Sequence, residues 1–191
     1  MKMELKEIAT VQMGYSFRVR LEQLDAGGIA VIQMKDLTDQ NRVDCGGLMR
    51  IDMEKVKEHH LVRPGDLVFR SRGLVTTSAL LVEDPDTAVV AAPLLRIRVT
   101  HRNVLPEYLN WSINQWPAQM FLASHARGTV QQMIGKDVLE KLEIAIPPLE
   151  RQRAIVEMAE LAEREQALMK KLAERRHQYL STTLLQLAQG E

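Results

Sequence analysis

Apolar and polar residues follow one pattern in the first three quarters of the chain and another in the last. The first part holds short apolar runs bounded by turn residues, which predict strands at 11–13, 29–34, 67–69, 78–82, 88–91 and 94–99. In the last of these, Leu95, Ile97 and Val99 alternate with Arg96 and Arg98, which predicts one buried and one solvated face. Several short strands with few helices indicate a curved, antiparallel-rich sheet.

Helical spacing is rarer before residue 147. We predict a short helix over residues 2–8, a second over 107–115 that Pro106 opens, and a third over 118–126. A strand-like run at 142–146 then meets Pro147-Pro148, a pair that suits the start of a helix but not its interior.

From Leu149 to about Leu187 the chain has no proline and no glycine, and charged residues interrupt an apolar stripe. This pattern predicts one long amphipathic helix. The predicted fold class is therefore α+β: a mixed, antiparallel-rich domain over residues 1–148 and a long helix over residues 149–191. Such a helix either folds back on its own domain or pairs with a partner, and the apolar stripe favours the partner.

The helix carries two charges in its apolar seam. With Ile155 at heptad position a, Glu165 falls at d and Arg176 at a. An antiparallel pair of copies, with its two-fold axis between Lys170 and Lys171, sets Glu165 against Arg176 of the second copy. A parallel pair sets each charge against itself, which is costly in a buried seam. We therefore expect an antiparallel homodimer whose interface includes Ala162, Glu165, Met169, Leu172, Arg176 and Tyr179.

Composition narrows the classes of protein to which the chain can belong. Lys plus Arg and Asp plus Glu are 25 each, so the net charge is zero, which argues mildly against a nucleic-acid binder. The single cysteine excludes an internal disulfide framework. No apolar run reaches the roughly 18 residues of a membrane span, and the start of the chain lacks an apolar signal core. These observations predict a cytoplasmic protein that does not use a membrane.

Catalytic and cofactor motifs are not evident. Gly135-Lys136-Asp137 lacks the spacing of a phosphate-binding loop, and His59-His60 has no spaced partner for a metal site. Residues 146–149 lack the Asn or Asp that begins an amino-methyltransferase motif. We therefore predict a chain that is not an enzyme and holds no metal or cofactor.

Four segments have a composition that favours DNA binding over catalysis: residues 15–20, 33–36, 70–73 and 127–132. They combine arginine, glutamine, hydroxyl and lysine side chains, the types that read base edges and hold phosphates. The residues that we expect to contact DNA are Tyr15, Arg18, Lys35, Arg70, Arg72, Arg127, Thr129, Gln131 and Lys136. The alternative is a dimeric coiled-coil adaptor whose globular part binds protein, which the neutral charge favours slightly.

The order of several segments resembles the specificity subunit of type I restriction-modification systems. These segments are residues 5–9, 14–17, 31–37, 64–73, 127–134 and 142–156. The resemblance implies a target-recognition domain followed by a spacer helix. Family members usually carry two such units with antiparallel helices, so this chain resembles a half-subunit that restores the arrangement as a homodimer.

The resemblance also implies partners and a role in phage defence. It implies double-stranded DNA with a bipartite recognition site, an adenine methyltransferase (modification) subunit docked on the helices, and a restriction/translocase subunit. S-adenosylmethionine and ATP are implied for those subunits and not for this chain.

Overall fold

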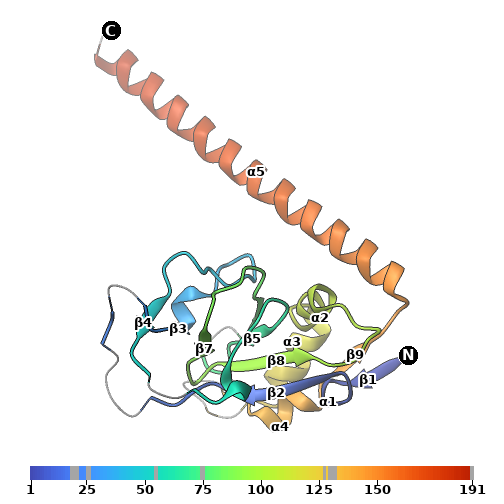
Figure 1. Ribbon diagram of the computed structural model, residues 1–191. Helices are drawn as coiled ribbons and strands as arrows, with labels where there is room; N and C mark the ends of the chain where they lie inside the picture. The colour runs from blue at the N-terminus through green and yellow to red at the C-terminus, as the bar shows by residue number, and fades with distance from the viewer. Residues whose placement is uncertain are drawn as a thin grey trace. The chain divides into compact units, whose positions relative to one another are not determined.

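The structure is a computed structural model that describes residues 1–17, 22–24, 27–53, 56–73, 76–126, 128 and 133–189. It contains two compact units: Met1–Arg153, called here the head, and Ala154–Glu191, called here the α5 extension (Figure 1). Helix α5 runs over Leu149–Gln189, so its first turn belongs to the head.

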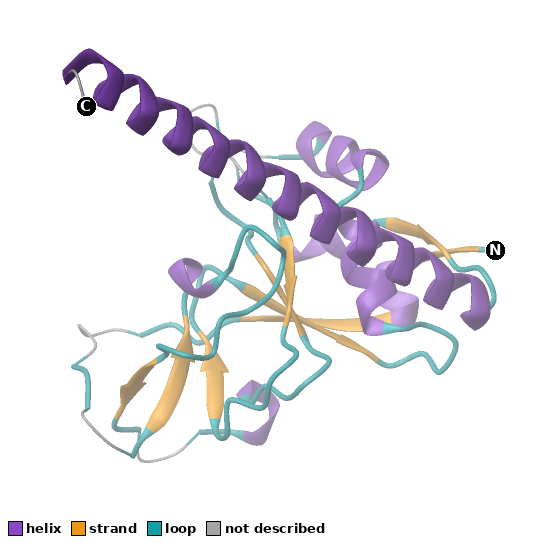
Figure 2. Ribbon diagram, turned by 90° about the horizontal axis from the view of Figure 1, so that it is seen from above, coloured by secondary structure: helices purple, strands orange, loops and turns teal. Residues whose placement is uncertain are grey.

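Among the residues that the structure describes, the strands of the head form three sheets (Figure 2). The largest has the order β2-β8-β5-β6, all antiparallel, with the bounds Ala9–Met13, Leu95–Val99, Leu67–Phe69 and Ser78–Leu80. The second has the order β4-β3-β7, with the bounds Met49–Ile51, Ile29–Ile32 and Ala88–Val90, and its β3–β7 pair is parallel. The third pairs β1 with β9, over Lys2–Glu4 and Glu143–Ala145.

The helices of the head are short. They are α1 (Leu5–Ile8), α2 (Pro106–Ile113), α3 (Trp116–Ser124) and α4 (Lys136–Glu140), with 3₁₀ turns η1 (Met34–Asp36) and η2 (Glu58–His60). Mixed, antiparallel-rich sheets followed by a long C-terminal helix confirm the predicted fold class. Over the described ranges, no helix has both the length and the apolar character needed to cross a membrane.

Strand β3 lies at the centre of the core because both of its faces are covered. Ala30 and Ile32 pack into one apolar cluster with Leu81. Val31, on the opposite face, packs into a second cluster with Val89. Burial on two faces explains why this strand is a continuous apolar run and not an alternating one.

Helix α2 covers the edge strand β6. Asn114 accepts from Ser78 N–H at 2.9 Å and donates to Ser78 C=O at 2.8 Å, as a neighbouring strand would. The hydroxyl of Ser78 donates to Asn110 Oδ1 at 2.6 Å. These bonds satisfy the backbone of Ser78 at this edge of the sheet and fix α2 against it.

The prediction that the face of β8 with Arg96 and Arg98 is solvated is wrong. Arg96 is only 6% exposed and donates to Leu61 C=O and to Gln12 Oε1, both at 2.8 Å. Arg98 donates twice to the carboxylate of Asp66, which is 1% exposed, at 2.6 Å. Both arginines also donate to Leu61 C=O, so the segment that contains Leu61 lies over this face of β8 and supplies partners there.

The segment predicted as a helix over residues 2–8 is a strand followed by one helical turn. Lys2–Glu4 pairs in antiparallel register with Glu143–Ala145, and only Leu5–Ile8 is helical. The pairing is between segments far apart in the chain, so tertiary contact overrides the local helical preference.

Gln152 fastens the first turn of α5 within the head. Its side chain is 0% exposed; Oε1 accepts from Leu105 N–H at 2.9 Å. Its Nε2 donates to the carbonyls of Asn103 and Pro147, both at 2.8 Å. Every hydrogen-bonding atom of this amide is therefore used.

Candidate functional site

Three of the four segments that the sequence suggested for DNA meet around one turn, Ala91–Ala92–Pro93, called here the 91–93 turn. Tyr15 C=O accepts from Ala92 N–H at 2.9 Å. Ser71 Oγ donates to Pro93 C=O, and Ser71 C=O accepts from Ile134 N–H at 2.8 Å. Ala91 N–H donates to Ile32 C=O at 2.9 Å, directly before Gln33. The turn thus gathers the segments after β2, β3 and β5, and the start of the segment that leads into α4.

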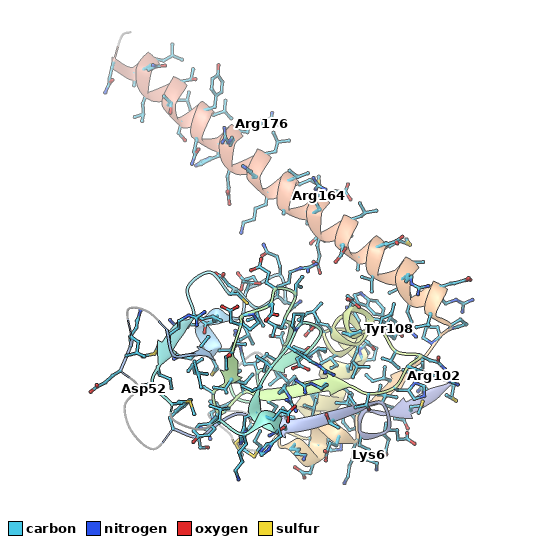
Figure 3. The ribbon with its side chains drawn as sticks, viewed as in Figure 1. Lys6, Asp52, Arg102, Tyr108, Arg164 and Arg176 are labelled. Atoms are coloured by element: carbon cyan, nitrogen blue, oxygen red, sulfur yellow. The ribbon has the colours of Figure 1, made fainter. Side chains whose placement is uncertain are left out.

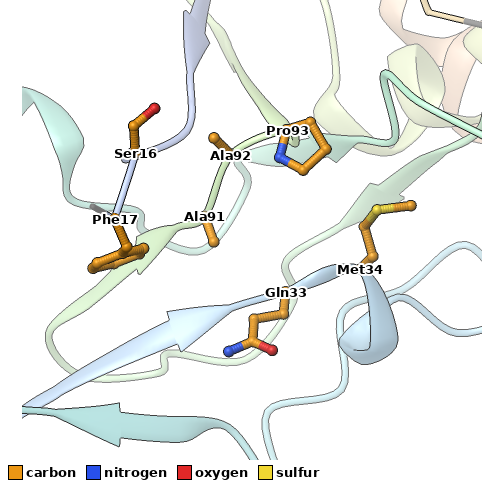
Figure 4. Close-up of a pocket in the computed structure, with 7 residues that line it drawn as sticks. All are labelled: Ser16, Phe17, Gln33, Met34, Ala91, Ala92 and Pro93. Carbon is orange, nitrogen blue, oxygen red and sulfur yellow. The ribbon is translucent and has the colours of Figure 1, made fainter. Parts of the chain in front are cut away.

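One open cavity of about 440 Å³ lies on one side of the turn, called here the Gln33 cavity (Figure 4). Besides the 91–93 turn, its lining is Ser16, Phe17, Gln33 and Met34. Most of this wall is apolar, and the Gln33 amide and the Ser16 hydroxyl supply its polar side-chain groups.

A second open cavity of about 450 Å³, called here the Arg72 cavity, is also lined by Ala92 and Pro93 of the turn. Arg72 and Lys136, which are 64 positions apart (136 − 72), both line it. Arg72 Nη2 lies 3.5 Å from Met133 Sδ, and Lys136 Nζ lies 3.5 Å from Glu140 Oε1. Both side chains are exposed, so two cations face solvent at the Arg72 cavity.

Turn η1 presents a third cation. Lys35 is 62% exposed and lies 3.8 Å from Asp36, whose carboxylate accepts from Gln33 N–H at 2.7 Å. Burial raises the pKa of Asp36, while the Gln33 N–H and the Lys35 ammonium lower it. Arg70 Nη2 donates to the carbonyls of Met34 and Leu37 at 3.1 and 3.4 Å, so this guanidinium stabilises the backbone of η1 and of the residue after it.

An aromatic group borders the Gln33 cavity. The ring of Tyr15 lies 4.9 Å from Phe17 and 5.3 Å, edge-on, from His60. His60 Nδ1 lies 3.3 Å from Gln12 Nε2. Burial lowers the pKa of His60, and the neighbouring His59 and Arg96 lower it further.

The predicted DNA contacts fall into two sets. Tyr15, Lys35, Arg70, Arg72 and Lys136 belong to the segments around the 91–93 turn, and Arg18, Arg127, Thr129 and Gln131 lie outside the described residues. The alanines and proline of the turn itself were not predicted, because apolar residues after a strand give no signal of a site. Within the described ranges, no group of three or more His, Cys, Asp or Glu residues is arranged to hold a metal ion.

The predicted interface residues lie along the α5 extension, and all six are exposed: Ala162, Glu165, Met169, Leu172, Arg176 and Tyr179. Figure 3 shows Arg164 and Arg176 projecting from the helix. The large apolar side chains are exposed as well, with Met169 at 64%, Leu172 at 69% and Tyr179 at 71%. Apolar exposure on this scale along one helix is typical of an association surface.

Comparison of the sequence with protein families gives one match. Residues 1–175 match the type I restriction modification DNA specificity domain. Comparison with curated proteins gives no significant match.

Solved structures of low sequence identity share the fold. The chain is 20% identical to the HsdS subunit from Thermoanaerobacter tengcongensis, with a TM-score of 0.67 over 90% of this chain and 39% of that one. A chain from a study of complex assembly and conformational transition of the type I R-M system is 20% identical, with a TM-score of 0.69 over 90% and 40%. The type I S subunit from M. genitalium is 13% identical, with a TM-score of 0.57 over 86% and 39%. The chain spans about two fifths of the length of these structures.

Proposed function

Because the chain belongs to the family of the type I restriction modification DNA specificity domain, we propose that it is the sequence-specific DNA-recognition subunit of such a system. In this proposal the head reads DNA and carries out no chemistry. An adenine methyltransferase subunit, and a restriction/translocase subunit where the system restricts, act at the site that the head selects.

The observation that carries the proposal is a set of exposed cations in the segments around the 91–93 turn: Arg72 and Lys136 line the Arg72 cavity, and Lys35 follows Met34 of the Gln33 cavity. Lys35, Arg72 and Lys136 come from three separate segments, and all are exposed. A local basic surface binds phosphates even when the whole chain is neutral, because binding depends on where the charges lie. We assign base reading to Arg72 and phosphate contacts to Lys35 and Lys136.

Arg70 takes a different role in this proposal. Two carbonyls of η1 and its following residue already accept from its guanidinium. It therefore positions Lys35, and because its Nε is buried, only its Nη groups are left for the backbone of the DNA.

The test is a selection with the full chain from a randomised duplex library at low salt. We expect one enriched motif, and affinity that falls steeply as salt rises because counterions are released from the phosphates. Arg72→Ala is expected to cost about 1–3 kcal/mol on the motif and to relax one position, whereas Lys136→Ala weakens binding on all sequences alike. No enriched motif at any salt concentration refutes the proposal and favours the protein-binding adaptor.

The α5 extension is proposed to pair with a second copy of itself in antiparallel orientation. Support comes from the exposed apolar stripe and from the seam charges, since only the antiparallel register sets Glu165 against Arg176 of the other copy. A two-fold pair of heads reads an inverted repeat with a gap, because the symmetry of the site mirrors that of the protein.

Charge reversal tests this pairing. Arg176→Glu is expected to shift the chain from dimer to monomer in size-exclusion chromatography with light scattering, and Glu165→Arg combined with Arg176→Glu restores the dimer. Arg164→Glu, outside the seam, serves as the control and leaves the dimer intact. A wild-type chain that elutes as a monomer at micromolar concentration contradicts the pairing.

Co-expression with the modification subunit of the same system tests the partner. Mapping of methylated adenines in the host DNA is expected to give a bipartite palindrome. A non-palindromic motif contradicts the homodimer, and absence of new methylation contradicts the partnership.

A further inference from the structure

We propose that the Gln33 cavity reads one A·T base pair, with the Gln33 amide on the adenine and the apolar wall against the thymine methyl group. This inference rests on the proposed DNA recognition and assigns one specificity-determining residue within it.

The wall of the cavity suits a methyl group. Phe17, Met34 and the 91–93 turn present apolar carbon to the open space of about 440 Å³. In the major groove, thymine is distinguished by its C5 methyl group, which proteins recognise by apolar contact. A wall of this kind gains little from cytosine, which lacks the methyl group.

The Gln33 amide suits adenine. A glutamine amide offers one acceptor and two donors, which match the N6 amino group and the N7 atom of adenine in a bidentate pair. The described contact of Gln33 Nε2 is with Met49 Sδ at 3.3 Å. A thioether sulfur is a weak acceptor, so the amide exchanges it for N7 at low cost.

The backbone of Gln33 is held before any ligand arrives. It follows directly on β3, whose residues Ala30, Val31 and Ile32 are each 0% exposed. Its N–H donates to Asp36 at 2.7 Å, and Arg70 braces the carbonyls of the same turn. A side chain on a fixed backbone loses less entropy on binding, which favours its use for specificity.

Guanine fits the cavity less well. Its O6 and N7 are both acceptors, so a bidentate contact needs the paired donors of an arginine or a lysine. Of the described residues that line the Gln33 cavity, none is cationic. Lys35 is adjacent in sequence but 62% exposed, which suits a phosphate contact at the rim.

The experiment repeats the randomised duplex selection with wild type, Gln33→Ala, Gln33→Glu and Gln40→Ala. Gln40 is an exposed glutamine seven positions along the chain (40 − 33) and does not line the cavity, so its variant is the matched control. Thermal melting of each variant checks that it folds.

We expect wild type and Gln40→Ala to prefer adenine at one position by roughly tenfold or more, and Gln33→Ala to lose that preference while the other positions of the motif stay unchanged. Gln33→Glu is expected to turn the preference to cytosine, because a carboxylate accepts from the cytosine N4 amino group. Replacing the paired thymine by uracil, which lacks the methyl group, is expected to weaken the wild-type complex by several-fold, about one buried methyl group.

Three outcomes overturn the inference. They are an unchanged motif in both Gln33 variants, a uniform loss of affinity on every sequence, and a wild-type complex indifferent to uracil. Each differs from failure of the proposed function, in which the wild-type chain itself selects no motif.

Discussion

The buried amide of Gln152 gives the sharpest prediction of stability, because all three of its hydrogen bonds lie within the head. In Gln152→Ala, the Leu105 N–H loses its acceptor at the start of α2. A buried donor without a partner costs about 1–3 kcal/mol. Asn103 is exposed and Pro147 is half-buried, so water replaces the amide on much of their carbonyl surface. Loss of the side-chain packing adds roughly 1 kcal/mol.

The expected total is a loss of about 2–4 kcal/mol in the free energy of unfolding of the head. For a unit of this size, each kcal/mol lowers the melting temperature by roughly 2–4 °C, so we expect a fall of about 5–15 °C. Urea denaturation followed by tryptophan fluorescence, with thermal melting beside it, measures both quantities.

Two further variants separate the hydrogen bonds from other effects. Gln166→Ala makes the same change at an exposed position of the same helix and is expected to stay within about 0.5 kcal/mol of wild type. Gln152→Glu keeps the shape but sets a carboxylate against two carbonyl oxygens, so it is expected to destabilise the head strongly at pH 8 and less at pH 5, where the protonated acid donates. A Gln152→Ala head as stable as Gln166→Ala refutes the reasoning.

Three other changes test the packing and charge of the head. Gly14→Ala sets a Cβ 2.6 Å from the backbone of the 91–93 turn and is expected to cost about 1–3 kcal/mol in urea denaturation, whereas Gly47→Ala, with open space around it, is neutral; equal effects contradict this. Asp66→Asn leaves the half-buried guanidinium of Arg98 without its carboxylate and is expected to cost roughly 3 kcal/mol, a figure that a loss below 1 kcal/mol disproves. The lowered pKa of His60 means that the folded head favours the neutral ring, so its contribution is complete above the ordinary value of 6.5 and is lost as the pH falls below it. Denaturation at pH 7.5 and 5.5 is expected to show less acid destabilisation in His60→Gln than in wild type, and identical pH dependence rules out this role.

The sequence predicted those elements whose signals are local. Pro64-Gly65 marks the turn before β5, and the predicted strand at 67–69 matches Leu67–Phe69. The pair Pro147-Pro148 and the residues after it predicted α5 in the same way, with its start at Leu149. In each case a few neighbouring residues determine the backbone.

Elements that depend on distant partners were not predictable in this way. β1 and β4 are three residues each and form through pairing with β9 and β3. Arg96 and Arg98 have the alternation of a solvated face, and only their contacts with Gln12 and Asp66 account for their burial. The sequence alone does not show whether a charged residue in a strand will meet a hydrogen-bond or ion-pair partner in the fold.

In the candidate site, too, some features have local sequence signals and others depend on contacts between distant segments. Residue types suited to DNA identified the segments of Lys35 and Arg72, and Lys136 as a separate DNA contact, but the position of these residues beside one another depends on the 91–93 turn, which has no such signal. The Gln33 cavity is likewise a product of packing, since its wall combines the end of β2, turn η1 and the residues after β7.

The pairing of β1 with β9 brings the two ends of the head together. Met1 C=O accepts from Ile146 N–H at 2.7 Å, and Leu5 N–H donates to Leu142 C=O at 2.9 Å, so the chain enters and leaves the head side by side. The segment between these two strands therefore begins and ends at the same place in the fold. An exchange of the residues between β1 and β9 therefore keeps the start of α5 in place only where the new segment offers the Gln152 amide the backbone groups that Asn103 and Leu105 offer here.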